Sequence, residues 1–128
     1  MDTCFDQCIQ QGSASLIGDR IQSGTGVANA ELLALGFANN ASGPIAGVIN
    51  RAGTRFHVFE PTVGQIRTYN LASAPTGNPP LYPEVVGSPI TLAGNPGNST
   101  AVRMTITPDG GTVFIAGPNG IAVQPTPP

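Results

Sequence analysis

The amino-acid sequence predicts an all-β fold made of propeller-like, four-stranded antiparallel modules, about two blades in all, with a short N-terminal helix or arm. Two observations favour this fold class. Short apolar runs recur along the 128 residues, and 17 glycines and 13 prolines separate them as turns. One strand–turn–strand unit also occurs twice, as stacked modules require. A small β-sandwich is the alternative fold.

The repeated unit is an apolar strand, a tight turn and a second apolar strand. Four pairs of residues align at one common offset: Val48 with Ile106, Gly53 with Gly111, Thr54 with Thr112 and Phe56 with Phe114. We therefore expect the turns Asn50–Gly53 and Pro108–Gly111 to be equivalent, each with its last glycine at positive φ. The same alignment predicts that Phe56 and Phe114 are buried on the same face.

Residues 1–27 are expected to form the N-terminal helix or arm. Helical spacing places Cys4, Phe5, Cys8 and Ile9 on one face of a short amphipathic helix.

Residues 28–38 fit two different elements. An N-cap at Asn29 and a stop at Gly36 would make a two-turn helix. The alternating apolar residues from Leu33 to Phe37 instead predict a strand over 31–38, which we favour because the following sequence is strongly β.

Residues 28–128 form the predicted β domain, with two repeats over about 44–92 and 101–124. The expected strands are 44–49, 54–59, 65–71, 84–92, 101–107, 112–116 and 121–124. These runs are rich in β-branched and aromatic residues and are bounded by glycine, proline and asparagine.

Two segments have distinctive surroundings. Gly87 and Pro89 interrupt the strand over 84–92, which predicts that it lies at a sheet edge. The proline-rich tail, 125–128, is expected to be extended and to lie on a neighbouring chain.

The second repeat carries a recognisable pattern. Its segment Ile106–Ala116 resembles the repeat of YVTN-type β-propellers, the family that includes lactonase-like propellers and archaeal surface-layer proteins. The resemblance covers about residues 44–124, although Asn50–Gly53 replaces the Pro-Asp-Gly-type turn in the first copy. It implies blade architecture and no particular chemistry, because such propellers serve many purposes.

The number of predicted strands implies assembly. One leading strand over 31–38, one four-stranded blade and three further strands make two blades, whereas closed propellers use about four to eight. Three chains would supply six blades, so a homotrimer is favoured. The leading strand or the proline tail would cross between subunits.

Charge is scarce, which excludes some partners. Charged residues are 9% of the chain, the net charge is −2, and all five cationic residues are arginine. Nucleic-acid binding and attachment to an anionic membrane are therefore not expected. We find neither a signal peptide nor an apolar segment of the roughly 20 residues that a membrane helix needs. A surface with so few charges is poorly soluble when exposed, which favours burying it against other subunits.

The residues that could carry chemistry are few. Cys4 and Cys8 have C-x3-C spacing, which is neither a redox motif nor half of a zinc site, so we interpret them as packing residues or a disulfide. His57, the only histidine, is interpreted as a strand residue satisfied by solvent or a cross-strand partner. Asp109 is interpreted as the acceptor that fixes its turn.

The remaining candidates do not form a site. Glu31, Glu60 and Glu84 lack paired-carboxylate spacing, and Gly24–Gly26 is too short for a phosphate loop. The aromatic side chains available for sugar stacking are Phe56, Phe59, Tyr69 and Tyr82, with no tryptophan.

These observations favour a non-catalytic, homo-oligomeric structural subunit with no catalytic residue, cofactor or metal. A virion decoration, head or tail component, or a surface-lattice protein, would fit, with other structural subunits as further partners. The expected location is a virion or an extracellular surface. A two-blade carbohydrate-binding module and a fragment of a lactonase-like propeller enzyme are the alternatives.

Overall fold

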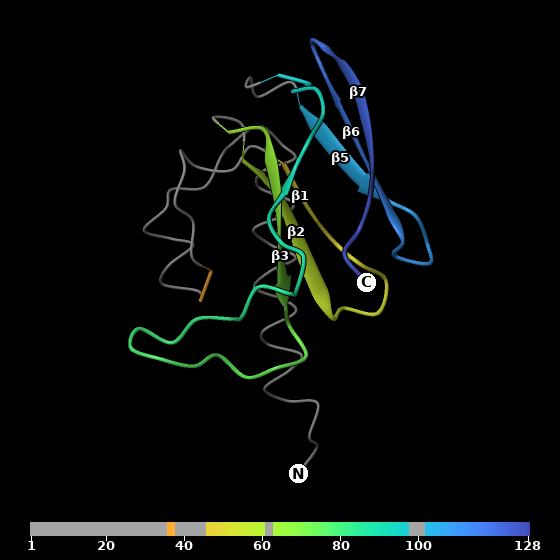
Figure 1. Cartoon of the computed structure of the whole chain (residues 1–128). Coiled ribbons are helices and arrows are strands. Elements are labelled where there is room, and N and C mark those ends of the chain that lie inside the picture. Colours follow the sequence, from red (N-terminus) through yellow and green to blue (C-terminus); the bar gives the residue numbers. More distant parts are fainter. Residues whose placement is uncertain (1–35, 38–45, 61–62, 98–101) are drawn as a thin grey trace.

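The computed structural model describes residues 36–37, 46–60, 63–97 and 102–128, and all regular elements among them are β-strands (Figure 1). The seven strands are β1 (Ala46–Ile49), β2 (Arg55–Glu60), β3 (Gln65–Asn70), β4 (Ile90–Thr91), β5 (Arg103–Ile106), β6 (Thr112–Gly117) and β7 (Gly120–Pro125). The predicted all-β class is thereby confirmed.

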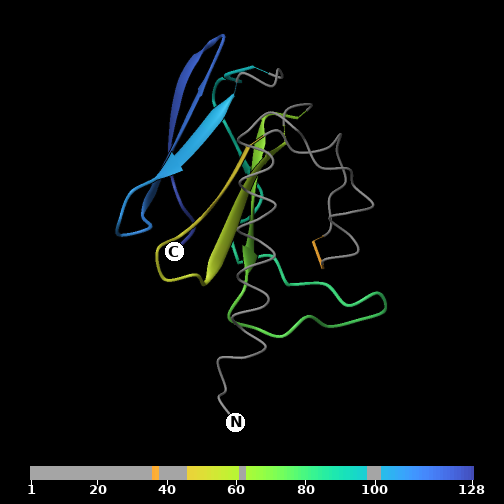
Figure 2. The same ribbon diagram turned by 180° about the vertical axis from the view of Figure 1, so that it is seen from behind.

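The strands form two antiparallel sheets with sequential strand order. The first sheet has the order β1-β2-β3-β4 and the second has the order β5-β6-β7. The sheets meet at β1 and β5, as the two opposite views show (Figures 1 and 2). Four strands followed by three correspond to the two predicted modules.

Some predicted elements differ from the structure or lie outside the described residues. The strand expected over 84–92 is shorter, because only Ile90–Thr91 joins the sheet and Glu84 forms a single bridge to Tyr69. Its edge position is confirmed. The predicted N-terminal helix or arm lies outside the described residues. Of the predicted element at 28–38, only Gly36 and Phe37 are described, and Gly36 is in a turn.

One apolar cluster joins the two sheets. It contains Phe37, Ala46, Phe56, Val58, Phe59, Ile66, Tyr69, Leu71, Tyr82, Leu92, Val102, Met104, Val113 and Ile115. The Phe37 ring lies 5.2 Å from that of Phe56 and 5.3 Å from that of Tyr69, in edge-to-face geometry that favours aromatic pairs. In β2 every residue from Phe56 to Glu60 is buried, so the first sheet is covered on both faces.

The two hairpins are equivalent, but one residue away from the alignment that the sequence suggests. The Gly53 N–H donates to the Asn50 carbonyl at 2.9 Å, and the Gly110 N–H donates to the Thr107 carbonyl at the same distance. Gly53 and Gly110 both have positive φ, 71° and 75°. The second turn is therefore Thr107–Gly110, and the expectation of Pro108–Gly111 is wrong.

This shift moves side chains to the other face, because successive strand residues point in opposite directions. Ile49 is opposite Phe56 in the first hairpin, and Ile106 is opposite Val113 in the second. Val113 is thus the counterpart of Phe56, and both are buried. Phe114 corresponds to His57 instead and is 37% exposed, so the prediction that both phenylalanines are buried is wrong.

The C-terminal tail makes contacts within its own chain, while its expected position on a neighbouring chain stays a prediction. The Thr126 hydroxyl donates to the Gly110 carbonyl at 2.7 Å. The Arg55 guanidinium donates to the carbonyls of Pro127 and Pro128 at 2.5 and 2.8 Å. Arg55 begins β2, so these contacts fasten the end of the second sheet to the first.

Replacing Gly110 with alanine should destabilise the protein by about 1 kcal/mol or more, because an L side chain is strained at positive φ. Gly111 is the matched control, since its φ lies outside that region and its counterpart Thr54 already carries a side chain. Urea unfolding of Gly110→Ala and Gly111→Ala would measure both. Equal losses, or a larger loss for Gly111→Ala, would contradict the register described above.

Candidate functional site

The main polar cluster of the described residues lies on one face of the first sheet. The Arg67 Nε donates to Glu60 Oε1 at 2.6 Å, and its Nη1 donates to Glu84 Oε1. The Ser88 hydroxyl donates to the other Glu84 oxygen at 2.7 Å. In the pairing of β2 with β3, Glu60 lies opposite Gln65. Arg67 is two residues further along β3, so its side chain is on the same face and diagonal to Glu60. One guanidinium thus bridges two carboxylates.

Burial controls the protonation of this cluster. Glu60 is fully buried, and burial raises the pKa of its carboxyl although the Arg67 charge opposes the shift. Burial acts to lower the pKa of Arg67, but the two carboxylates raise it overall. Glu60 Oε2 has no hydrogen-bond partner among the described residues. The Glu60 carboxylate is therefore sealed and ion-paired, whereas the Glu84 side chain is 27% exposed.

His57 is also a buried strand residue. It is 1% exposed, and its Nδ1 lies 2.8 Å from the hydroxyl of Thr68, its direct cross-strand neighbour. Burial, together with the Arg55 charge, lowers the pKa of His57 to about 4. The imidazole is therefore neutral at pH 7. The interpretation as a strand histidine with a cross-strand partner fits this geometry, whereas a base exposed on a blade face does not.

The other candidates lie outside the described residues or in a turn. Cys4, Cys8, Glu31 and Gly24–Gly26 lie outside the described residues. Asp109 accepts hydrogen bonds from the Thr107 hydroxyl and the Gly111 N–H, which lower the pKa of its carboxyl and confirm its role in fixing the turn.

The described residues contain neither a metal-ligand cluster nor a membrane-spanning helix. Their His, Cys, Asp and Glu side chains form no group of three that could hold a metal ion. Within the same part of the chain, no helix has the length and apolarity to cross a membrane.

The aromatic residues considered for sugar stacking are in the core. Phe56, Phe59, Tyr69 and Tyr82 are all buried, at most 5% exposed. A stacking platform needs an accessible ring face, so these four cannot provide one.

The second sheet, in contrast, exposes an apolar face, which we call the outer face. It consists of Arg103 and Thr105 on β5, Phe114 and Ala116 on β6, and Ile121 and Val123 on β7. Ile121 is 72% and Val123 58% exposed. Phe114 lies opposite Val123, and Ala116 lies opposite Ile121, so their side chains form one continuous patch. A shallow depression of about 220 Å³ lies between Arg103, Phe114 and Ile121.

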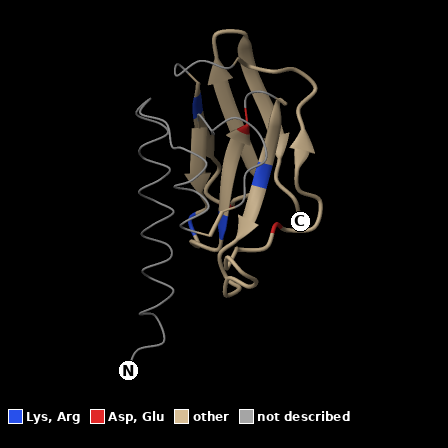
Figure 3. Cartoon of the chain, turned by 90° about the vertical axis from the view of Figure 1, so that its left-hand side faces the viewer, with Lys and Arg blue, Asp and Glu red and all other residues tan. Residues whose placement is uncertain are grey.

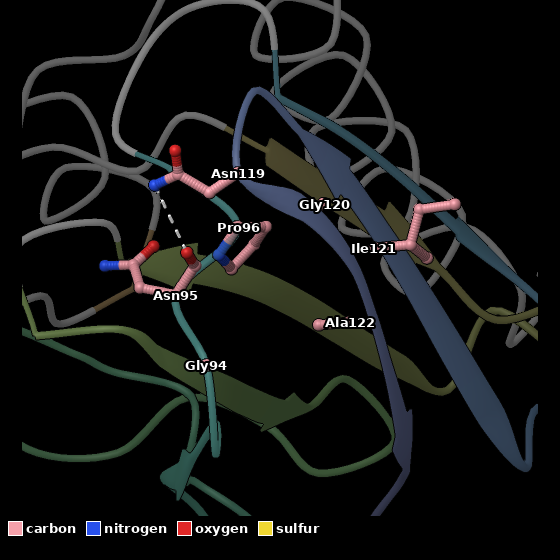
Figure 4. Close-up of a pocket in the computed structure, with 7 residues that line it drawn as sticks. All are labelled: Gly94, Asn95, Pro96, Asn119, Gly120, Ile121 and Ala122. Atoms are coloured by element: carbon pink, nitrogen blue, oxygen red, sulfur yellow. Dashed lines mark hydrogen bonds between the residues drawn. The ribbon is translucent and has the colours of Figure 1, made fainter.

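The edge of β7 that pairs with no other described strand, which we call its free edge, borders further hollows. One, of about 110 Å³, lies between Gly94–Pro96 and the start of β7 (Figure 4). Another, of about 260 Å³, is lined by residues 92–94 and 121–124. Together they form a groove along the edge of β7, which we call the edge groove. Charged residues are sparse on both sheets (Figure 3).

Comparison with known proteins gives no relative: no family model, no curated protein and no solved structure matches this chain.

Folding stability should fall as the pH is lowered from about 6.5 to about 4 because of His57. The unfolded chain binds a proton near 6.5 and the folded chain only near 4, so acid favours unfolding by about 3 kcal/mol at pH 4. Glu60 opposes this, since its raised pKa lets the folded state take up a proton first. His57→Gln, which keeps a polar group for Thr68, isolates the histidine contribution. Denaturant unfolding at several pH values measures the free energy of unfolding of the wild type and of His57→Gln. If the assignment is wrong, the two free energies will change with pH in parallel.

Arg67→Met should destabilise by about 3 kcal/mol at pH 7, because it leaves the Glu60 charge buried and unpaired. Glu84→Gln should cost clearly less, since the Glu84 side chain is 27% exposed and Glu60 keeps its partner. The Arg67→Met loss should also shrink toward pH 5 as Glu60 becomes protonated. Thermal unfolding at both pH values measures these differences, and a loss independent of pH would contradict the ionic explanation.

Proposed function

We propose that this protein is a non-catalytic structural subunit that assembles with further copies of itself. The observation that carries this proposal is the outer face. Phe114, Ile121 and Val123 are exposed side by side on a regular sheet surface. Scattered exposed apolar residues are ordinary, whereas the largest contiguous apolar patch on a chain is often a functional contact surface.

The distribution of chemistry-bearing residues supports a non-catalytic role. Glu60 and His57, which could act as acid or base, are sealed in the first sheet. The exposed residues of the outer face are mostly aliphatic or aromatic, with Arg103 and Thr105 at one margin. Such a surface recognises another apolar surface and offers no reacting group.

The size of the patch determines what kind of assembly it supports. β6 and β7 have six residues each and β5 has four, so at about 3.3 Å per residue and about 4.8 Å between strands the face presents roughly 250 Å². A stable protein interface buries about 800 Å² on each partner. One outer-face contact is therefore weak, and a stable assembly needs a second contact on the same subunit. Repeated weak contacts of this kind suit a lattice or particle, such as a virion component or an extracellular surface layer.

The expected trimer stays a prediction. Its route through the proline tail lacks support, because the tail is fastened to Arg55 of its own chain. The alternative of carbohydrate binding is not favoured, since its candidate aromatic residues are buried.

Val123→Lys should reduce self-association by at least tenfold, because it places a charge in the apolar patch. Val86→Lys is the matched control, since Val86 is 93% exposed and lies in a loop away from the outer face. Light scattering and sedimentation from about 1 to 500 µM would follow the mass of each protein. A wild-type protein that stays monomeric throughout, or equal effects of the two lysines, would refute the proposal.

A further inference from the structure

We propose that the free edge of β7 pairs with β7 of a second copy, antiparallel about a two-fold axis, so that the two second sheets become one. This inference rests on the proposed self-assembly and identifies the second contact that the small outer face requires. It concerns main-chain pairing in the plane of the sheet and not packing on the outer face.

The register identifies the free main-chain groups. The Thr126 N–H donates to the Gly111 carbonyl, which continues the pairing of β7 with β6. Main-chain groups alternate in direction along a strand, so those of Ala122 and Gln124 also point toward β6. The N–H and C=O groups of Ile121 and Val123 therefore point to the opposite edge. Among the described strands, only β6 pairs with β7.

The first sheet shows how an equivalent edge is covered. β3 takes the place in its hairpin that β7 takes in the second, and β4 pairs with it through Gln65–Thr91 and Ile66–Ile90. In the described part of the second sheet, β7 has no such fourth strand. The edge groove lies there instead, between β7 and residues 92–96. At Gly94, which lines this groove, there is open space, since a Cβ there would meet no atom within 4 Å.

The edge also lacks the features that keep strands from pairing. Natural edges carry charges, inward lysines, prolines or bulges. β7 has the sequence GIAVQP, with no charged residue and with its single proline at the last position. Two such strands meet without opposing like charges.

A second copy is the occupant that this edge matches best. With Ile121 opposite Val123 of the second copy, the outward groups of both residues find partners on both chains. The two Ala122 residues then face each other at the axis, and Pro125, which has no N–H, stays outside the hydrogen-bonded pairs. A two-fold contact uses the same patch on both subunits, as this register does.

Amide hydrogen exchange of the wild-type protein tests the pairing directly. We expect the Ile121 and Val123 amides to exchange at least tenfold more slowly at 500 µM than at 5 µM, together with a mass that rises to a dimer or a multiple of it. A rising mass with both amides still exchanging rapidly would overturn the edge pairing and leave the proposed self-assembly standing. A mass that never rises would overturn both, and a trimer would overturn the two-fold arrangement.

A proline substitution separates the edge from the outer face. Val123→Pro removes an outward N–H while keeping an apolar side chain and the hydrogen bonds to β6. We expect it to weaken dimerisation at least tenfold. The control is Val86→Pro, which lies before Gly87 in a turn closed by the Ser88 N–H and the Val85 carbonyl, where proline fits. Equal dimerisation of the two variants would overturn the pairing, and if Val123→Pro does not fold, the exchange measurement decides.

Discussion

The register of the two hairpins is the constraint on which the rest of the structure depends. In each turn, the side chain of the first residue accepts a hydrogen bond from the strand that follows: Asn50 Oδ1 from the Arg55 N–H at 3.1 Å, and Thr107 Oγ1 from the Thr112 N–H at 3.2 Å. A glycine at positive φ closes each turn. These contacts determine which side chains point to which face, because a slip by one residue would invert every strand.

The same register has different consequences in the two sheets. His57 and Phe114 hold equivalent positions, yet the polar residue is buried and the apolar one is exposed. The first sheet is covered on both faces, so position alone does not decide polarity there. Its buried polar groups, Glu60 and His57, find partners in Arg67 and Thr68. Such networks cost desolvation energy and select one arrangement over others. The second sheet has one covered face, and its apolar outer residues remain available.

Much of the fold could be predicted, because the strands follow local periodicity and glycine or proline turns. The starts and ends of β2, β3 and β6 lie within one residue of the expected ones. The one-residue error in the second turn has a local cause: Gly110 and Gly111 are adjacent, and either could take positive φ. The structure uses Gly110, since this lets Thr107 close the turn. The expected strand over 84–92 is longer than β4, because the length of β4 depends on its pairing with β3 and not on local strand propensity.

The candidate surfaces were harder to predict than the strands. The Glu60–Arg67 pair could be predicted only by extending the expected strand 54–59 to Glu60, which then lies opposite Gln65 and diagonal to Arg67. The outer face could not, because the wrong alignment placed Phe114 inside. The edge groove depends on where residues 92–96 pass β7, and no local pattern encodes that position.

The attachment of the tail has a consequence for the order of folding. Each hairpin closes through contacts between near neighbours, whereas the Arg55 contact with Pro127 joins residues 72 positions apart. Contacts of such long range form late, because closing the loop costs chain entropy before any contact is gained. A chain whose β6–β7 hairpin has formed but not yet docked therefore exposes the Val113 and Ile115 face as well as the open edge. Association during folding competes with docking at that stage, so dilute conditions favour the correctly closed subunit.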